Sequence, residues 1–299
     1  MMTERLQRIT EVPKLPPRRR EGHKGDYGRV VIVGGSPGMI GATALAANAA
    51  FRGGAGLVTF AAPRTIQQGV AVLCPCATSI PLECDEQGAV TPAGLRQVMT
   101  AARQCDVLAV GPGMGVGAPQ QEIVAAALEQ DRPVVLDADG LNNLARIEDW
   151  PARRRCPLVL TPHPGEFSRL TAQTITHVQG NRAQVAVDAL RKWTDGATEE
   201  DPALVVVLKG AGTVVTNGRR FYVNDTGNPG MACGGSGDIL TGLVAAMIGQ
   251  SFELFDAACL AVRVHGHAGD LAAAELGEVS LMASDLLDYL PQATKDAVG

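Results

Sequence analysis

The sequence predicts an α/β fold in which helices cover both faces of a largely parallel central sheet. Short apolar runs alternate with alanine-rich segments through most of the 299 residues, a rhythm typical of strand-helix-strand units. The apolar runs are nearly continuous, as expected for strands buried on both faces. Only 4% of the residues are aromatic against 46% hydrophobic, so small aliphatic side chains must fill the core.

Six apolar runs are predicted to be strands, and most end in glycine, proline or a polar residue: Arg29–Val33, Leu57–Phe60, Val107–Val110, Pro133–Leu136, Leu158–Leu160 and Leu204–Leu208. The predicted crossover helices between them include Thr43–Arg52, Pro119–Gln130 and Asn181–Trp193. A hairpin is expected next, because Asn217-Gly218 separates the runs 212–216 and 219–223. From Asp238 to the end, helices are expected to dominate.

Residues 23–299 are predicted to form a single domain, because no stretch is long enough to be a linker. Residues 1–22 are expected to be a flexible leader, basic and interrupted by prolines, with charges that include Lys14 and the run Arg18 to Arg20. Such a leader could touch a polyanion, although a solvated tail is the simpler interpretation.

Composition excludes several classes of protein. The net charge is −5, which gives no overall basic surface for nucleic acid. No apolar run reaches the roughly 18 residues of a membrane helix, and the start lacks a signal peptide. The seven cysteines are scattered, which favours reduced thiols in a cytoplasm. His265 and His267 lie two apart on a predicted helix, so they face different directions and make a poor metal pair.

The junction at residues 227–242 carries the strongest chemical signal, because a glycine-rich turn meets an apolar helix there. The predicted anion turn comprises Gly234, Gly235, Ser236 and Gly237, whose amides can face one anion. Asp238 then lies in the first helical turn, beside the positive end of the helix dipole. It could act as a base toward a hydroxyl while the amides hold a phosphoryl group. Alternatively, Asp238 only caps the helix.

Ligands of open parallel sheets bind beyond the carboxyl ends of the strands. Five polar or glycine-rich segments follow predicted strands and could face one cleft: 34–38, 111–115, 137–140, 161–166 and 209–213. Gly113 to Ala118 fits the loose dinucleotide pattern G-x-G-x-x-A, but Pro112 and the surplus glycines favour a loop instead. The P-loop and protein-kinase motifs do not occur in the sequence.

The late G-S-G-D motif at 235–238 resembles that of the ribokinase-like superfamily. Its vitamin kinases typically carry Thr-Pro-Asn-x-x-Glu, whereas this chain has His163 in the segment 161–166. Four further segments together with 161–166 resemble the NAD(P)H-hydrate dehydratases over about residues 23–290: 24–28, 34–36, 137–142 and 228–232. Cys233 and Ser236 stand where threonine is commoner, but Ser236 keeps the hydroxyl. The chain has no room for the epimerase domain of many relatives, so it looks like the free-standing type.

This resemblance implies an ADP-dependent dehydration of (S)-NADHX and (S)-NADPHX, the hydrates of NADH and NADPH, with release of AMP and phosphate. Asp238 would be the catalytic base, and Mg²⁺ would be bound through water near Glu166 and Asp137. By resemblance, the hydrated cofactor would contact Ala42, Gly113, His163 and Asp238. The nucleotide would contact Lys209, Gly210, Ala211, Gly212, Thr213 and Gly237.

Purely structural interpretations of these residues stay open. Segment 209–213 could be only a strand exit, His163 only a loop histidine, and Glu166 or Asp137 only a helix cap. The resemblance also implies a cytoplasmic homotetramer and a separate epimerase that acts alongside it. Two other functions compete with the dehydratase. One is a vitamin kinase of the hydroxymethylpyrimidine type, which His163 argues against, and the other is an adenylate sensor, which Asp238 argues against.

Overall fold

The computed structural model describes residues 6–195, 198 and 201–299, and in this part of the chain ten strands form one sheet. The order across the sheet is β1-β10-β9-β8-β7-β6-β5-β2-β3-β4. All neighbours pair in parallel except β9, which is antiparallel to both β8 and β10. The strands are β1 (Gln7–Ile9), β2 (Arg29–Val33), β3 (Leu57–Pro63), β4 (Thr78–Leu82), β5 (Val107–Val110), β6 (Val134–Leu136), β7 (Leu158–Leu160), β8 (Leu204–Leu208), β9 (Val214–Thr216) and β10 (Arg220–Val223).

The strand order reverses between β2 and β5. From β2 the chain moves outward through β3 to the edge strand β4, and it then returns to β5 on the other side of β2. It continues outward in the opposite direction through β6, β7 and β8. At such a reversal the loops after the two neighbouring strands turn away from each other, which opens a crevice at the carboxyl end of the sheet.

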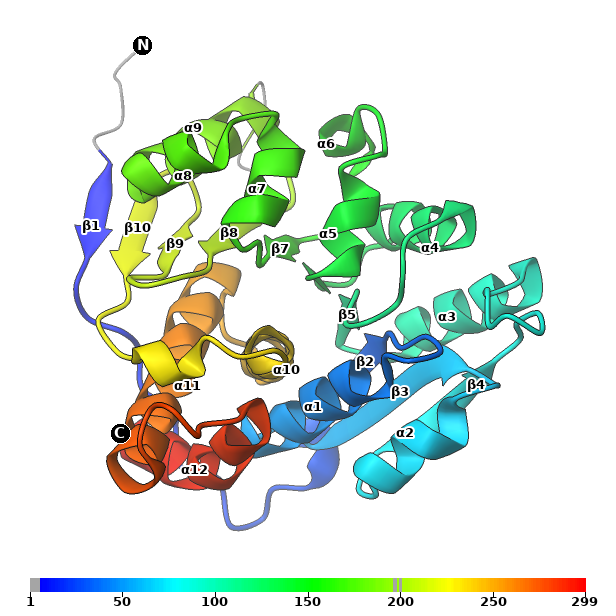
Figure 1. Cartoon of the computed structure of the whole chain (residues 1–299), viewed down its shortest axis with the longest axis horizontal. Helices are drawn as coiled ribbons and strands as arrows, with labels where there is room; N and C mark the ends of the chain where they lie inside the picture. Colours follow the sequence, from blue (N-terminus) through cyan, green and yellow to red (C-terminus); the bar gives the residue numbers. More distant parts are fainter. Residues whose placement is uncertain (1–5, 196–197, 199–200) are drawn as a thin grey trace.

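Helices lie on both faces of the sheet (Figure 1). Alternate residues of β2 enter two separate cores, Val30 and Ile32 on one face and Val31 and Val33 on the other. The first core is covered by α1 (Ile40–Arg52), α2 (Gln67–Leu73), α10 (Ser236–Gly249), α11 (Leu254–Leu276) and α12 (Ala283–Asp296). The second is covered by α3 (Pro92–Gln104), α4 (Ala118–Leu128), α5 (Asp139–Leu144), α6 (Trp150–Arg153), α7 (Pro164–Thr171), α8 (Ile175–Gly180) and α9 (Arg182–Trp193). Two short 3-10 helices, η1 (Lys24–Tyr27) and η2 (Pro229–Met231), complete the described elements.

Helix α10 packs closely between α1 and α11 (Figure 1). A side chain at Gly242 would collide with the carbonyl oxygen of Ala46, so α1 and α10 meet backbone to backbone. Since α1 follows β2, this packing brings the first turn of α10 to the carboxyl edge of the sheet. The close contact therefore positions Asp238 relative to the strand exits.

The predicted fold class is confirmed, and so are the six strands and the hairpin at Asn217-Gly218. Two strands were missed. Edge strand β4 contains Pro81, which edge strands tolerate and which interrupts the sequence pattern of a strand. Strand β1 has the short polar sequence Gln-Arg-Ile, and its identity depends on the partner β10.

The predicted leader differs from the structure in its described part, residues 6–22. Strand β1 pairs with β10, Leu15 is buried, and the Leu15 N–H donates to the Ala297 carbonyl at 2.9 Å. The Arg18 guanidinium lies 4.1 Å from the centre of the Tyr27 ring. These residues are attached to the sheet and to the C-terminal segment. This attachment could not be predicted from the polar sequence of the segment, because the contacts are made by backbone groups and by partners that are distant in the sequence.

Candidate active site

Backbone hydrogen bonds join the exits of neighbouring strands at the carboxyl edge of the sheet. The Gly35 N–H donates to Pro112 O at 2.9 Å, and the Asp137 N–H donates to Val110 O at 3.2 Å. The Lys209 N–H donates to Pro162 O at 2.8 Å. The five segments that the sequence predicted to share one cleft thus follow β2, β5, β6, β7 and β8 along a single edge.

The anion turn enters α10 above this edge. Gly235 is the residue before the helix and has φ +98°, a left-handed conformation that favours glycine. Its Cβ would also lie only 2.7 Å from the Leu45 side chain. Asp238 is the third residue of the helix, so the predicted placement of the acid in the first turn agrees with the structure.

A buried ion pair lies directly beneath the turn. Lys209 Nζ donates to Asp137 Oδ1 at 2.5 Å, and it lies 3.9 Å from Glu166 Oε2. Thr241 Oγ1 donates to the other oxygen of Asp137 at 2.7 Å. A Cβ added at Gly237 would lie 3.1 Å from Lys209 Nζ, so the ammonium group touches the base of the anion turn. The lysine therefore adds a positive charge where an anion would be held.

Burial, and then the excess of acidic over basic groups, changes the pKa values of the carboxyl groups in this cluster. Burial, followed by the negative charge of Asp137, raises the pKa of Asp238 to about 7, although Lys209 opposes the shift. Burial also raises the pKa of Glu166 above its ordinary range. Burial disfavours the charged form of Lys209, but Asp137 and Glu166 outweigh this effect and raise its pKa. Asp238 thus has the pKa expected of a general base that works near neutrality.

His163 caps α7 and fixes Glu166. His163 Nδ1 accepts hydrogen bonds from the N–H groups of Gly165 at 2.9 Å and Glu166 at 3.3 Å. The His163 N–H in turn donates to Glu166 Oε2 at 2.8 Å. The ring proton is therefore assigned to Nε2, which lies 3.3 Å from Glu166 Oε1. Burial, together with the charges of Lys209 and Arg169, lowers the pKa of His163, so its ring is neutral at pH 7.

The structure brings together Gly113 and Ala42, two of the residues expected to line the hydrated-cofactor site. A Cβ at Gly113 would lie 3.1 Å from the Ala42 Cβ and 2.9 Å from the Met39 carbonyl oxygen. Ser36 Oγ donates to the Gly113 carbonyl at 2.8 Å. These contacts lie where the strand order reverses, between the loops after β2 and β5. Only small residues fit at this point of the crevice.

Segment 209–213 connects β8 to β9, and its members point in different directions. The Lys209 side chain turns inward to Asp137. Thr213 Oγ1 accepts from the Gly210 N–H at 3.3 Å and donates to the Gly210 carbonyl at 3.0 Å, which closes the loop on itself. Gly210 and Gly212 both have positive φ. The backbone around Ala211 and Gly212 is exposed, so a ligand can approach it closely.

Two features of the site were missed from the sequence. Thr241 lies one helical turn after Asp238, a spacing that could have revealed it. His265 Nε2 lies 3.3 Å from Ser236 Oγ, a contact between α11 and α10 that only the fold creates. Burial lowers the pKa of His265 to about 4, so it is neutral there. His267 instead contacts Asp296 at 3.0 Å, which agrees with the prediction that the two histidines diverge.

Ala138, between Asp137 and Asp139, has φ 48° and ψ −118°, which is rare for a residue with a side chain. The surrounding hydrogen bonds hold it in place. Asp139 Oδ2 accepts from the Gly115 N–H at 2.9 Å, and Asp137 is fixed by Lys209 and Thr241. Strained backbone of this kind concentrates at functional sites.

Among the described residues, no three histidine, cysteine or acidic side chains form a metal-binding group. One or two carboxylates can still fit Mg²⁺, because a nucleotide supplies phosphate oxygens and water completes the shell. The acidic excess around Asp238 fits such a cation, since Asp137, Asp139 and Glu166 all raise the pKa of Asp238. The oxygens of Asp137 are already bound to Lys209 and Thr241, which favours contact through water.

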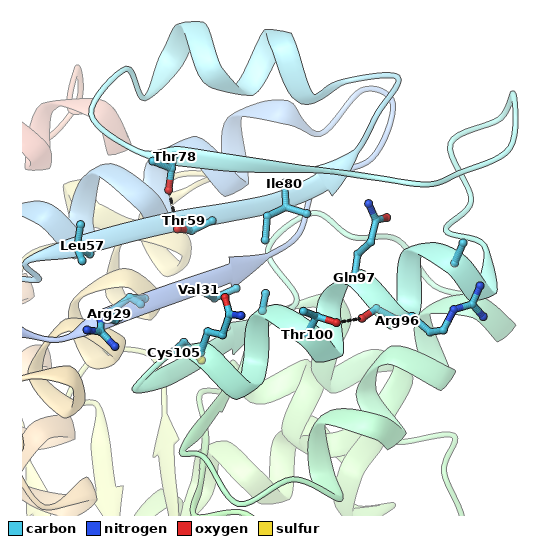
Figure 2. A pocket seen from close by; sticks show the side chains of 14 residues that line it. Arg29, Val31, Leu57, Thr59, Thr78, Ile80, Arg96, Gln97, Thr100 and Cys105 are labelled. Carbon is cyan, nitrogen blue, oxygen red and sulfur yellow. Dashed lines mark hydrogen bonds between the residues drawn. The ribbon is translucent and has the colours of Figure 1, made fainter. Parts of the chain in front are cut away.

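A cavity of about 610 Å³ lies elsewhere, between α3 and strands β2, β3 and β4 (Figure 2). Its lining mixes apolar residues such as Leu57 and Ile80 with polar residues such as Thr59, Thr78 and Arg96. It contains no predicted site residue. Because the acidic groups near Lys209 and the anion turn are at the strand exits, those exits are the candidate active site.

No helix in the described ranges combines the length and the apolar character needed to span a membrane.

Comparison with known proteins identifies the family. The family model described as NAD(P)H-hydrate dehydratase matches residues 30–292. The bifunctional NAD(P)H-hydrate repair enzyme Nnr of Moorella thermoacetica is 42% identical over 285 residues, which are 95% of this chain and 52% of the relative. The chain thus spans about half the length of the curated relatives it matches.

Solved structures agree with this result. The ADP/ATP-dependent NAD(P)H-hydrate dehydratase of Bacillus subtilis, co-crystallised with ATP and Mg²⁺, superposes with a TM-score of 0.81 at 30% identity. The match covers 97% of this chain and 100% of that one. Hydroxyethylthiazole kinase of Pyrococcus horikoshii, with a TM-score of 0.59 at 16% identity, covering 89% of this chain and 88% of that one, shares the fold alone. The ribokinase-like fold is therefore confirmed, and the chain belongs to the NAD(P)H-hydrate dehydratase family of hydro-lyases.

Proposed function

We propose that this enzyme returns hydrated NADH and NADPH to the intact cofactors in a reaction driven by a nucleotide, with ADP as the phosphoryl donor. One observation carries the proposal. Asp238, whose pKa is raised to about 7, lies at the entry to α10 beside an anion turn that rests on Lys209. A base and an oxyanion site in contact are what the phosphorylation of a hydroxyl requires.

In the proposed mechanism, ionised Asp238 takes the proton of the ring hydroxyl as its oxygen attacks the terminal phosphorus of the nucleotide. The bond from that phosphorus to the bridging oxygen breaks, and AMP leaves when the donor is ADP. The amides of residues 235–238 and Lys209 hold the negative charge of the transferring group. A preorganised donor of this kind can contribute about 3 kcal/mol.

The second step is elimination. The ring nitrogen lone pair expels phosphate, which is a better leaving group than hydroxide, and the neighbouring carbon then loses a proton to restore the ring double bond. The hydroxyl oxygen leaves in the phosphate, so water is formally removed. Ala42 and Gly113, whose loops pack closely against each other, would line the ring, while neutral His163 can donate or accept a hydrogen bond without adding charge.

Mg²⁺ would supply positive charge to the nucleotide phosphates when bound. Glu166 and Asp137 would hold it through water. Both carboxylates are buried and face Lys209. The remaining groups of the site bind substrates and move protons.

The choice of ADP as phosphoryl donor depends on the distance between the bound adenylate and the anion turn. If segment 209–213 binds the adenylate close to the anion turn, a β-phosphate reaches the hydroxyl and an added γ-phosphate must be accommodated elsewhere. An error of about 1 Å in position can cost about 100-fold, so we expect a clear preference. The Bacillus subtilis relative is described as ADP/ATP-dependent, which makes the comparison of both nucleotides essential.

We also propose a cytoplasmic location, a homotetramer and cooperation with an epimerase that supplies the reactive stereoisomer. The location rests on the seven cysteines, all of which are free thiols. The epimerase rests on the relatives, which are bifunctional repair enzymes. The tetramer rests on family resemblance.

The deciding experiment follows the near-ultraviolet absorbance of the dihydronicotinamide ring after purified enzyme is added to hydrated NADH or NADPH with ADP and Mg²⁺. Recovery of the absorbance with stoichiometric AMP and phosphate supports the proposal. A stable phosphorylated vitamin alcohol, with no recovery from hydrated cofactor, would favour the kinase alternative. Recovery with ATP, freed of ADP, that exceeds recovery with ADP would reject the donor but keep the dehydratase.

A further inference from the structure

One side chain outside the proposed mechanism binds the exit of β8 at three points. Arg182, the first residue of α9, donates from Nη2 to the carbonyls of Leu208 at 2.6 Å and Lys209 at 2.7 Å. It donates from Nη1 to the carbonyl of Ala211 at 2.8 Å. The planar guanidinium thus bridges the end of the strand and the loop proposed to bind the nucleotide.

The guanidinium also packs against the backbone of that loop. A Cβ at Gly210 would lie 2.5 Å from Arg182 Nη1, so the side chain occupies the space beside Gly210. Thr213 closes the loop from within, through its two hydrogen bonds with Gly210. Arg182 therefore fixes the carbonyls of Leu208, Lys209 and Ala211 from outside the loop, in addition to the bonds that Lys209 makes to Pro162 and Asp137.

The positive charge of Arg182 is not neutralised by an acid. Within the described ranges no carboxylate lies within ion-pair distance of its guanidinium. Its Nε is buried and has no hydrogen-bond partner. Burial alone lowers the pKa of the group below its ordinary value. Three carbonyl dipoles offset part of the charge, and an anion bound at the loop would offset the rest.

We propose that Arg182 is a positioning residue for the nucleotide: it holds residues 208–211 in the shape that receives the adenylate and adds positive charge behind its phosphate. This inference rests on the proposed function, because it assumes that segment 209–213 binds the nucleotide. It adds a residue that acts through the loop backbone and does not touch the reacting atoms.

The test compares Arg182→Ala, Arg182→Lys and a matched control, Arg191→Ala. Arg191 lies on the same helix and also donates to a backbone carbonyl, that of Gly218 at 3.2 Å, but at the hairpin turn. Calorimetry with AMP and with ADP measures nucleotide affinity without turnover. Steady-state kinetics give KM for nucleotide and for hydrated cofactor separately, and thermal unfolding monitors the fold.

We expect Arg182→Ala to weaken AMP binding by at least about tenfold and to raise the nucleotide KM similarly, since hydrogen bonds to a charged group are lost. The KM of hydrated cofactor and kcat at saturating nucleotide should stay within about threefold of wild type. Arg182→Lys keeps the positive charge but loses the planar guanidinium that bonds to three carbonyls. This variant should therefore bind AMP nearly as poorly as the alanine variant. Arg191→Ala should bind AMP like wild type.

Unchanged AMP affinity in folded Arg182→Ala overturns the inference, as does an equal loss of affinity for AMP and for hydrated cofactor. If the alanine variant does not fold, the lysine variant decides: affinity within about twofold of wild type means that the three-point contact is unnecessary. Failure of the proposed function is distinguished from this outcome, because it shows in the wild-type protein itself, as no recovery of absorbance from hydrated cofactor with ADP and Mg²⁺.

Discussion

The strand-exit site and the cavity beside α3 differ in their position on the sheet and in the charged groups that they contain. The cavity has a volume of about 610 Å³ and lies along the side of the sheet, among β2, β3 and β4 (Figure 2). The strand-exit site gathers Asp137, Glu166, Lys209 and Asp238. Of these two regions, only the strand-exit site has carboxyl groups whose pKa values are raised toward neutrality by burial and by neighbouring negative charges.

The comparison sets empty space against clustered charge as signs of function, and the proposed function depends on the charge. Around the cavity, burial raises the pKa of the Cys105 thiol to about 12, so that thiol stays protonated and unreactive. At the strand exits, the folding of five separate loops onto one edge keeps acids together despite their repulsion. Such an arrangement costs stability and is retained where chemistry needs it.

The largest expected effect comes from removing the base of the strand-exit site. Asp238→Asn keeps the shape of the side chain and loses its basicity, so kcat should fall by at least about 100-fold while AMP binding survives. The measurement is kcat with hydrated NADH and saturating ADP. Asp256→Asn is the matched control, because Asp256 also lies in the first turn of a helix but pairs with Arg220 away from the site. Near-normal turnover in Asp238→Asn would refute the assignment.

A second substitution separates the nucleotide from the hydrated cofactor. Gly212 has φ +64°, a conformation that a β-branched residue adopts only with strain. Gly212→Val should raise the nucleotide KM by at least about tenfold and leave the KM of hydrated cofactor within about twofold. Gly277→Val provides the control, since Gly277 has φ +77° and open space but lies at the end of α11. Equal rises in both KM values for Gly212→Val would indicate damage to the hairpin instead.

The pH dependence should report the raised pKa of Asp238. Because the base must be ionised, kcat/KM should rise with pH through about 7, and one unit below that value it should be about tenfold under its plateau. Stability should change in the opposite direction. A carboxyl whose pKa is raised by folding stabilises the native state at low pH, and this contribution is lost as pH rises through about 7.

Asp238→Asn should therefore unfold at a higher temperature than wild type at about pH 8, while the difference shrinks toward about pH 5. Thermal unfolding of both proteins across this range provides the check. A variant that is less stable than wild type at the higher pH would show that the carboxylate is well compensated in the folded protein.

The smallest effect is expected at the cavity. Arg96 lies on α3 and lines it (Figure 2). Arg96→Ala should leave kcat/KM for hydrated NADH within about twofold of wild type, because the cavity that Arg96 lines contains none of the proposed site residues. A loss of tenfold or more with normal folding would connect the cavity to catalysis and remove the contrast between the two regions.

The sequence by itself determined the parallel sheet, the hairpin and the acid at the entry to α10. Apolar runs of strand length, Asn217-Gly218, and a glycine turn followed by Asp238 are local signals, and local backbone preference is enough to interpret them. The family resemblance also pointed to His163 and to segment 209–213 before any geometry was known.

Only the tertiary structure decided how these residues act on one another. The pairing of Lys209 with Asp137 joins positions 72 residues apart, and the bond from Thr241 to Asp137 spans 104 residues. Residues Gln7–Ile9 form a strand because they pair with the edge of β10. Arg182 contacts the end of β8 because α9 packs along the sheet beside that strand. Contacts between distant segments depend on packing, and burial among those contacts is what moves the pKa of Asp238 toward neutrality.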